Sequence, residues 1–232
     1  MKRIACIIAA AAVLASTSNG QLLADNFNSE NGGNSAQSYA SFANWTATGQ
    51  VSLFRNGSNG INCSGLCVAF DGLDFPSSIT AKQTFSFVLG DVMRFSFDVS
   101  GNQRSAEVDN IFLRLMFGSA QQFTSYSSFF GFPGGSTSPG SFASTFTIAR
   151  SGIAQTAPFA NFWLEFTAAT SGSVQYALGS NSVDGFGPVV DNVLVTRNAA
   201  VVPEPSAWTM ILAGLCVLSS VARRRRNFYA RG

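Results

Sequence analysis

Hydrophobic and polar residues alternate in short runs through the middle of the chain. In "DVMRFSFDVSG" and "IFLRLMF" nearly every second residue is apolar, which places the apolar side chains on one face of an extended strand. "SFASTFTIAR" and "NFWLEFTA" repeat the pattern. We therefore expect one buried and one wet face on each strand. The predicted core residues are Met93, Phe95, Phe97, Val99, Ile111, Leu113, Leu115, Phe117, Phe142, Phe146, Ile148, Phe162, Leu164 and Phe166.

Turn-forming residues interrupt these runs about every ten residues, which is typical of a β-sandwich. No stretch between residues 25 and 200 keeps a helical period, and "GFPGGSTSPG" at 131–140 is predicted to be a loop. We expect an all-β fold, a two-sheet jelly-roll β-sandwich, over residues 21–198. The predicted strands are 42–48, 50–55, 67–71, 79–88, 92–99, 108–117, 141–149, 160–167, 173–178 and 188–197.

The chain begins with a short cationic segment, an apolar run from Ile4 to Ala15 and then small polar residues. This is the layout of a secretory signal peptide, which we place at residues 1–20. Cleavage after Ala15 and cleavage after Gly20 both suit a small-residue peptidase pocket, and the pattern does not choose between them. The alternative is an uncleaved amphipathic or membrane-spanning start, which the short apolar run and the polar "STSNG" after it disfavour.

A second apolar run covers residues 207–222. Its sixteen residues would rise roughly 24 Å as a helix, somewhat less than a ~30 Å hydrocarbon core. Trp208 and the arginines after the run would anchor its two ends at the membrane interfaces. We predict a linker at 199–206 on the outer side, a transmembrane helix at 207–222 and a basic cytoplasmic tail at 223–232.

The order of motifs in this tail is specific: a Pro-Glu-Pro triplet, the apolar run and a block of arginines. The residues are Pro203, Glu204, Pro205, Arg223, Arg224, Arg225 and Arg226. The tail resembles the PEP-CTERM sorting signal of Gram-negative bacteria. The resemblance implies that the protein is held transiently in the inner membrane, handled by the membrane protease exosortase and delivered to the cell surface or extracellular matrix. Six further residues, "NFYARG", depart from the pattern, and a plain membrane anchor is the alternative.

The two ends of the chain account for its formal net charge of +2. Residues 22–200 hold seven Lys and Arg against eleven Asp and Glu, a balance of −4. A mildly acidic middle offers no basic surface for nucleic acid, so we expect no nucleic-acid partner.

Cysteine usage indicates one disulfide. Cys6 lies in the signal peptide and Cys216 in the second apolar run, which leaves Cys63 and Cys67 in the exported domain. Two cysteines in an oxidising compartment are expected to pair. A redox-active or metal-binding pair is the alternative. It is weaker because redox motifs usually have two intervening residues, and because zinc would need two more ligands from a chain without histidine.

The absence of histidine excludes Ser-His-Asp and His-zinc chemistry. A glycan hydrolase needs only two carboxylates, and Asp71 with Asp74, or Glu107 with Asp109, are close in sequence. Acids at turns and on wet strand faces are ordinary in a sandwich, however. We therefore predict that the protein is not an enzyme.

Aromatic residues on a jelly roll can stack against sugars at its end loops or on its concave face. Trp163 lies on the face opposite to Phe162 and Leu164, which makes it the predicted platform for a ligand. Tyr126, in "QFTSYSSFFGF", is the second candidate because it is close to a predicted loop. The alternative is that both faces of the Trp163 strand are buried.

Several segments follow one another in an order that resembles a galactose-binding-like jelly roll: "DNFNSENGG", "FANWTATGQVSLF", "RFSFDVSGNQR" and "GFGPVVDNVLVT". The resemblance implies that the last strand pairs beside the first and that Asp25 and Asp191 help to hold a structural calcium. The alternative is that Asp191 satisfies backbone groups near a strand end.

These features together predict an exported cell-surface or matrix protein whose sandwich associates with extracellular polysaccharide. The alternatives are a structural envelope protein that associates with copies of itself and a carboxylate-based glycan hydrolase.

Overall fold

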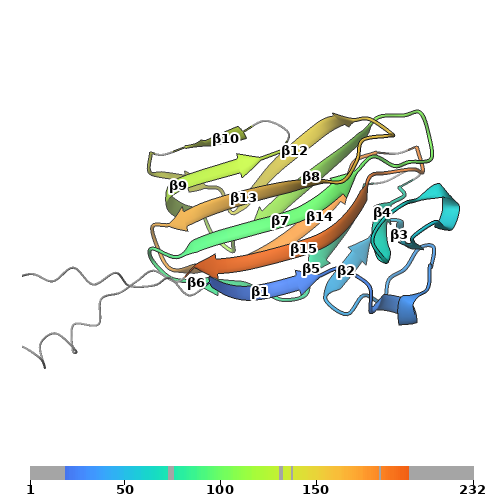
Figure 1. Cartoon of the computed structure of the whole chain (residues 1–232). Helices are drawn as coiled ribbons and strands as arrows, with labels where there is room; N and C mark the ends of the chain where they lie inside the picture. Colours follow the sequence, from blue (N-terminus) through green and yellow to red (C-terminus); the bar gives the residue numbers. More distant parts are fainter. Residues whose placement is uncertain (1–18, 73–75, 131–132, 137, 183, 199–232) are drawn as a thin grey trace, which may run out of the picture. The chain divides into compact units, whose positions relative to one another are not determined.

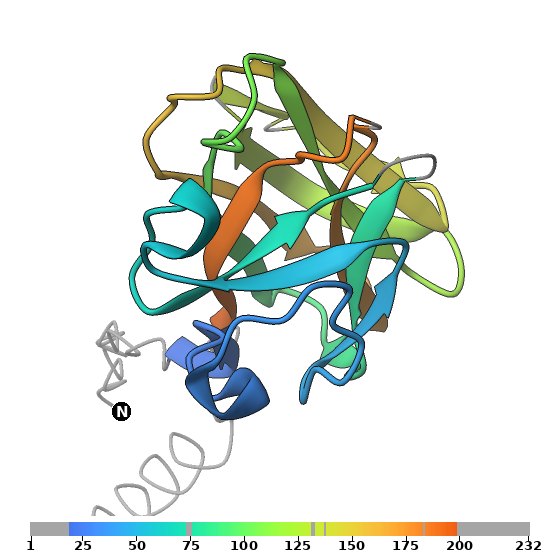
Figure 2. The ribbon, with the colours of Figure 1, turned by 90° about the vertical axis from the view of Figure 1, so that its right-hand side faces the viewer.

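The computed structural model describes residues 19–72, 76–130, 133–136, 138–182 and 184–198. They form a sandwich of two antiparallel β-sheets with two short 3-10 turns, η1 (Glu30–Gly33) and η2 (Ser58–Gly60) (Figures 1 and 2). The all-β, two-sheet prediction is confirmed. Most of the predicted signal peptide and the whole predicted membrane helix lie outside the described residues. Within the described ranges, no helix is long and apolar enough to cross a bilayer.

The larger sheet follows the order β10-β9-β13-β7-β15-β4-β3, with β1 also paired to β15 and β11 to β9. Its strands are β1 (Asn19–Asp25), β3 (Val51–Arg55), β4 (Leu66–Phe70), β7 (Val92–Ser100), β9 (Gln121–Phe129), β10 (Pro133–Ser136), β11 (Gly140–Phe142), β13 (Ala160–Ala168) and β15 (Val189–Asn198).

The smaller sheet follows the order β12-β8-β14-β5-β2, with β6 also paired to β14. Its strands are β2 (Trp45–Thr48), β5 (Ser77–Ala81), β6 (Phe85–Phe87), β8 (Asp109–Met116), β12 (Thr145–Ile153) and β14 (Gly172–Ser180).

The core between the sheets is built largely from the residues that the alternation predicted. On β7 the four predicted core residues are buried, while Arg94 and Asp98 between them are partly exposed. Many core contacts are between aromatic rings, which favour edge-to-face contact. Two predicted core residues, Phe146 and Ile148, are only half-buried, because β12 is the edge strand of the smaller sheet.

Three strands lie where the sequence did not predict them. β1 precedes the first predicted strand, β9 was not predicted, and β10 falls within the predicted loop 131–140. The β9 segment "QQFTSYSSF" is rich in serine and glutamine, so its alternation is weak. It is a strand because it pairs with β13, from Trp163 opposite Phe129 to Ala168 opposite Phe123. The predicted strand 79–88 is divided between β5 and β6.

The first strand pairs with the last, as the jelly-roll resemblance implied, with Asn19 opposite Asn198. Asn19 and Gly20, the last two residues of the predicted signal peptide, are part of β1.

Strand β7 defines the two ends of the sandwich. It pairs with β15 from Asn198, opposite Val92, to Val189, opposite Ser100. The sandwich therefore has a tail end, where β1 begins and β15 ends, and a loop end, where β7 leads into residues 101–108 and β15 begins. In Figure 1 the tail end is on the left and the loop end on the right.

Candidate functional site

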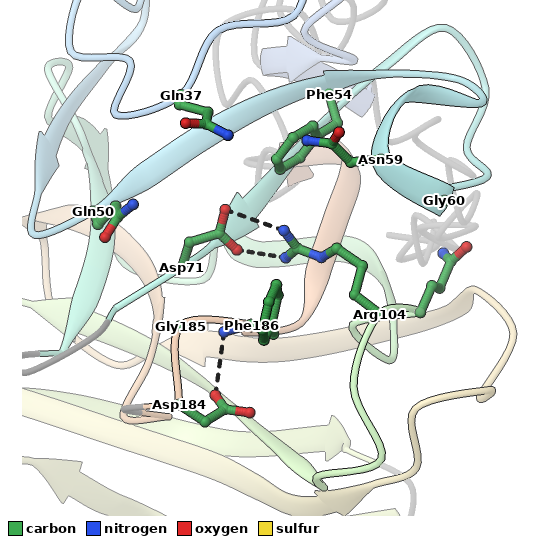
Figure 3. Close-up of a pocket in the computed structure, with 11 residues that line it drawn as sticks. Gln37, Gln50, Phe54, Asn59, Gly60, Asp71, Arg104, Asp184, Gly185 and Phe186 are labelled. Atoms are coloured by element: carbon green, nitrogen blue, oxygen red, sulfur yellow. Dashed lines mark hydrogen bonds and ion pairs between the residues drawn. The ribbon is translucent and has the colours of Figure 1, made fainter.

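A pocket of about 650 Å³ opens at the loop end. It lies where η2 and the neighbouring loops, the residue after β4, the 101–108 loop and the loop before β15 meet (Figure 3). Its volume is within the range of small-ligand sites. The lining residues are Gln37, Gln50, Phe54, Asn59, Gly60, Asp71, Gln103, Arg104, Asp184, Gly185 and Phe186.

A buried ion pair forms one wall of the pocket. Arg104 Nη2 lies 2.5 Å from Asp71 Oδ1, and Arg104 Nη1 lies 3.4 Å from Asp71 Oδ2 (Figure 3). The two side chains are only 9% and 6% exposed. Buried charges are tolerated when they pair with good geometry. The pair therefore holds the guanidinium of Arg104 in one place.

The guanidinium of Arg104 also contacts two aromatic rings. Its Cζ atom lies 5.0 Å from the ring centroid of Phe54 and 5.0 Å from that of Phe186, within the range of cation–π contacts. Phe54 is buried on β3, whereas Phe186 is 41% exposed. Phe186 is therefore an apolar surface in fixed position within a largely polar pocket.

Asn102 shapes the loop that carries Arg104. Its Oδ1 accepts hydrogen bonds from the backbone N–H groups of Arg104 and Ser105, both at 2.8 Å. Asparagine favours such turns because its side chain replaces a backbone acceptor. Gln103 ties the loop to the segment after η2, since its Oε1 accepts from the Asn62 N–H at 2.8 Å. These hydrogen bonds tie the loop to itself and to the segment after η2.

Three amide side chains in the lining have no hydrogen-bond partner among the described residues: Gln37, Gln50 and Asn59. Gln50 is half-buried and the other two are exposed. Each amide offers two donor hydrogens and an acceptor oxygen. This pattern suits hydroxyl groups, which also donate and accept.

The pocket has an excess of negative charge. Arg104 is matched by Asp71, and Asp184 accepts hydrogen bonds from Ser105 Oγ and from the Phe186 N–H, both at 3.3 Å. Asp109 is close enough to Asp184 and Arg104 to interact with both, and burial, aided by Asp184, raises its pKa to about 7. An anionic ligand would be repelled here. A neutral polar ligand fits the charge better.

The sequence did not single out Arg104 or Phe186 as site residues. The only local signal for Arg104 is a lone arginine in an Asn- and Gln-containing turn, "GNQRSAE", within a domain of low charge. Its partner Asp71 is 33 positions away, so their meeting depends on the fold.

Trp163 lies on the outer face of the larger sheet and is half-buried. The guanidinium of Arg94 covers its ring, with Cζ 4.5 Å from the ring centroid. Arg94 also contacts Glu165 Oε2 at 3.7 Å. One ring face of Trp163 is therefore occupied by a side chain, and Trp163 does not line the pocket.

Tyr126 does not lie beside Trp163. It pairs with Phe166 across β9 and β13, so its side chain shares the core-facing side with Phe166. Its ring packs edge-on against Phe123, with centroids 5.2 Å apart. The two predicted ligand residues thus lie on opposite faces of one sheet, and neither lines the pocket.

The two acids predicted for calcium are both buried. Asp25 accepts hydrogen bonds from Trp45 Nε1 and from a backbone N–H, both at 2.8 Å, and Asp191 accepts from the Asn192 N–H at 2.7 Å. Burial raises the pKa of Asp191 to about 7, with contributions from Asp98 and Asp25. Calcium prefers oxygen ligands, whereas these carboxylates face N–H donors. Within the described residues no group of three or more acidic, cysteine or histidine side chains is placed to hold a metal ion. Calcium stays a prediction.

Cys63 and Cys67 form the predicted disulfide, with their Cα atoms 6.3 Å apart. Gly65 between them has a φ of 89°, a conformation that glycine adopts readily. The bridge closes the turn before β4, the strand that leads to Asp71.

The four acidic residues considered for glycan hydrolysis do not form one site among the described residues. Asp71 faces Arg104, and Asp74 lies outside the described residues. Glu107 is exposed, whereas Asp109 is buried. Of these four residues, the described pocket lining includes Asp71 alone.

Comparison with solved structures gives distant likenesses. The xylan-binding CBM22-1 domain of Paenibacillus barcinonensis Xyn10C is 11% identical with a TM-score of 0.42, and the match covers 81% of this chain and 100% of that one. An apo-form cyclase from Fischerella sp. is 13% identical with a TM-score of 0.48, covering 80% and 99%. The CBM22-1–GH10 modules of Clostridium thermocellum Xyn10B, solved with xylohexaose, are 14% identical with a TM-score of 0.43, covering 76% and 28%. At these identities and TM-scores, neither xylan binding nor cyclase activity carries over to this chain.

No curated protein matches the chain. Residues 201–226, which lie outside the described part of the structure, match the PEP-CTERM protein-sorting motif. The match includes the Pro-Glu-Pro triplet at 203–205 and the arginines at 223–226, so the predicted sorting motif is confirmed. The motif implies recognition by an exosortase. The chain is therefore an exported protein that is sorted to the cell surface by a PEP-CTERM signal.

Proposed function

We propose that this protein is a non-enzymatic cell-surface module, with jelly-roll connectivity, that binds a neutral polysaccharide in the pocket at its loop end. The observation that carries the proposal is the set of amides of Gln37, Gln50 and Asn59, which have no hydrogen-bond partner among the described residues. They lie around the fixed Arg104 and the exposed ring of Phe186.

The chemistry of a neutral sugar matches this set. Sugar hydroxyls exchange hydrogen bonds with amides in both directions, and the apolar face of a pyranose ring packs against an aromatic ring. The hydrogen bonds of the 101–108 loop support the same proposal, since a loop held by its own contacts loses less conformational entropy when a ligand binds.

The PEP-CTERM sorting motif supports the proposal that the ligand lies outside the cell. We propose that residues 207–222 anchor the chain in the inner membrane until exosortase acts, and that the sandwich then reaches the surface or the extracellular matrix. Polysaccharide is an abundant polymer in that location.

The test is retention of the full chain, purified in detergent, on immobilised neutral glucan, on polyuronate and on exopolysaccharide from the producing cells. We expect retention on a neutral glycan, reduced roughly tenfold by Phe186→Ala through loss of ring packing. Gln50→Met, which keeps the shape but removes the amide, should weaken retention as well. Trp163→Ala is the matched aromatic control, and it should leave retention unchanged.

Other outcomes would point elsewhere. Retention lost in Trp163→Ala but kept in Phe186→Ala would move the site to the outer face of the sheet. Retention on none of the three polymers would contradict the proposal and favour a structural envelope protein, which self-association at micromolar concentration would support. Release of reducing sugars would indicate a hydrolase.

A further inference from the structure

Two aliphatic side chains are exposed at the tail end, in the turn between β6 and β7. Val88 is 53% exposed and Leu89 is 61% exposed. The residue after them, Gly90, has a φ of 86° and allows the chain to turn. A leucine and a valine side by side at the tip of a turn form a small apolar surface, which we call the tip.

The tip is held in place by buried groups. Asp91 is 1% exposed, and its Oδ2 accepts a hydrogen bond from the Val88 N–H at 2.9 Å. The Asp91 N–H donates to the Val88 carbonyl at 3.1 Å, and the Gly90 N–H donates to the Ala168 carbonyl at 2.8 Å. The tip is therefore presented by the fold, not by a loosely attached loop.

The tip lies next to the point where the chain leaves the sandwich toward its sorting signal. Arg197 Nη1 donates to the Ser86 carbonyl at 3.1 Å, and Arg197 Nε lies 3.9 Å from Asp91 Oδ2. Asn198, the last described residue, pairs with Val92, the first residue of β7, which follows the turn that carries the tip. Eight residues, 199–206, then precede the apolar run at 207–222. Even fully extended they reach roughly 30 Å.

The charges around the tip suit an anionic surface. The side chain of Arg197 is 38% exposed, whereas that of Asp91 is 2% exposed. The turn 169–171, which follows the Ala168 carbonyl bonded to Gly90, reads Ala-Thr-Ser and carries no charge. A partly exposed cation beside two aliphatic side chains matches the headgroup and acyl boundary of an anionic bilayer.

We propose that the Val88–Leu89 tip is a membrane-contact site, which rests in the interface of an anionic bilayer while residues 207–222 anchor the chain. This inference rests on the membrane anchoring in the proposed function. Two side chains bind a bilayer weakly by themselves, but the short linker keeps the tip close to the membrane and raises its effective concentration. The contact places the tail end of the sandwich on the membrane and turns the loop end, with its pocket, away from it.

The experiment is photolabelling of the full chain in vesicles of phosphatidylethanolamine and phosphatidylglycerol that contain a lipid with a diazirine on its acyl chain. Lipid adducts are located by proteolysis and mass spectrometry. The peptide of Val108 is the internal control, because Val108 is 64% exposed but lies at the loop end. We expect adducts at 207–222 and at the tip, with the tip labelled roughly tenfold more than the control, as expected when a leucine side chain leaves water.

The variant V88S/L89S should lose the tip adducts and keep those at 207–222, whereas Val108→Ser should change neither. Both variants alter exposed side chains, and thermal unfolding checks that the fold is intact. Adducts at 207–222 without adducts at the tip would overturn this inference and leave the anchoring standing. No adducts at either place would overturn both, and glycan retention would then test the pocket separately. Self-association that Leu89→Ser abolishes, without adducts at the tip, would assign the tip to a second copy of the chain and overturn the membrane contact.

Discussion

The loop end and the tail end of the sandwich share the same strands but differ in what they present. The loop end has a buried ion pair, a carboxyl group with a raised pKa, and a pocket lined by amides that have no partner among the described residues. The tail end has a tight turn with two exposed aliphatic side chains and one partly exposed arginine. Because the core is continuous between them, the difference lies in the connecting segments. One scaffold can therefore offer a polar site at one end and an apolar contact at the other.

The largest expected difference between the two ends is the effect of removing an arginine. Arg104→Met leaves Asp71 buried without its cation, which should lower the free energy of unfolding by ~3–5 kcal/mol. Arg197→Met removes a partly exposed charge 3.9 Å from Asp91, and the loss should stay below ~1 kcal/mol. Urea unfolding of both variants measures the contrast. Equal losses would show that the Arg104 pair is not energetically special, and the double variant R104M/D71N should recover part of the loss.

The second comparison is the effect of adding a methyl group at a glycine of each end. A Cβ at Gly187 would overlap the carbonyl oxygen of Phe70, whereas one at Gly118 meets nothing within 4 Å. We expect Gly187→Ala to cost ~1–3 kcal/mol or more, since a rigid backbone cannot move aside easily, and Gly118→Ala to cost almost nothing. Thermal unfolding decides this. A neutral Gly187→Ala would mean that the loop before β15 yields readily.

A pH dependence should arise from the loop half of the molecule. Asp109 and Asp191 have a pKa of about 7 in the folded state, against about 3.9 for an unfolded aspartate. The folded state binds more protons between these values, so the free energy of unfolding should fall as pH rises from about 4 to about 7 and then level off. The midpoint of thermal unfolding should be higher at pH 5 than at pH 8. Asp109→Asn and Asp191→Asn should each flatten this dependence, and an unchanged slope in both would contradict the assignment.

Calcium should have the smallest effect. The carboxylates of Asp25 and Asp191 already accept hydrogen bonds from N–H groups, so we expect calcium and chelator to give the same unfolding midpoint. A midpoint that rises with calcium, in wild type but not in Asp191→Asn, would restore the predicted metal site. It would also remove the contribution of Asp191 to the pH dependence, because a bound cation would keep that carboxylate ionised.

Local pattern was sufficient to predict most of the sandwich and its core. Strand β13 alternates between buried and partly exposed residues from Phe162 onward, because one of its faces packs in the core. On β7 the apolar residues alternate in the same way from Met93 to Val99, although Ser96 on the other face is buried too. Strand β9 escaped prediction because pairing with β13, more than its own residues, makes it a strand. The disulfide was predicted because its cysteines are close in sequence and no other cysteine remains in the domain.

Local sequence patterns could not predict the pocket. Arg104 and Asp71 come from distant loops. The sequence contains many phenylalanines, most of them buried, and nothing in it distinguishes the exposed Phe186 from the others. Trp163 lies opposite Phe162 and Leu164, as the alternation predicted, but no feature of the sequence indicated that Arg94 would cover its ring. Contacts between distant segments depend on strand order, which hydrophobic alternation does not encode.

The pairing of β1 with β15 has a consequence for the timing of export. The strand synthesised first finds its partner only when the last strand of the domain has appeared, and contacts of such long sequence separation form slowly. The larger sheet can therefore complete its pairing only after residue 198 has been exported. By then the sorting signal that begins at residue 201 has nearly reached the translocation machinery. Closure of the sandwich therefore follows the arrival of its sorting signal and does not precede it.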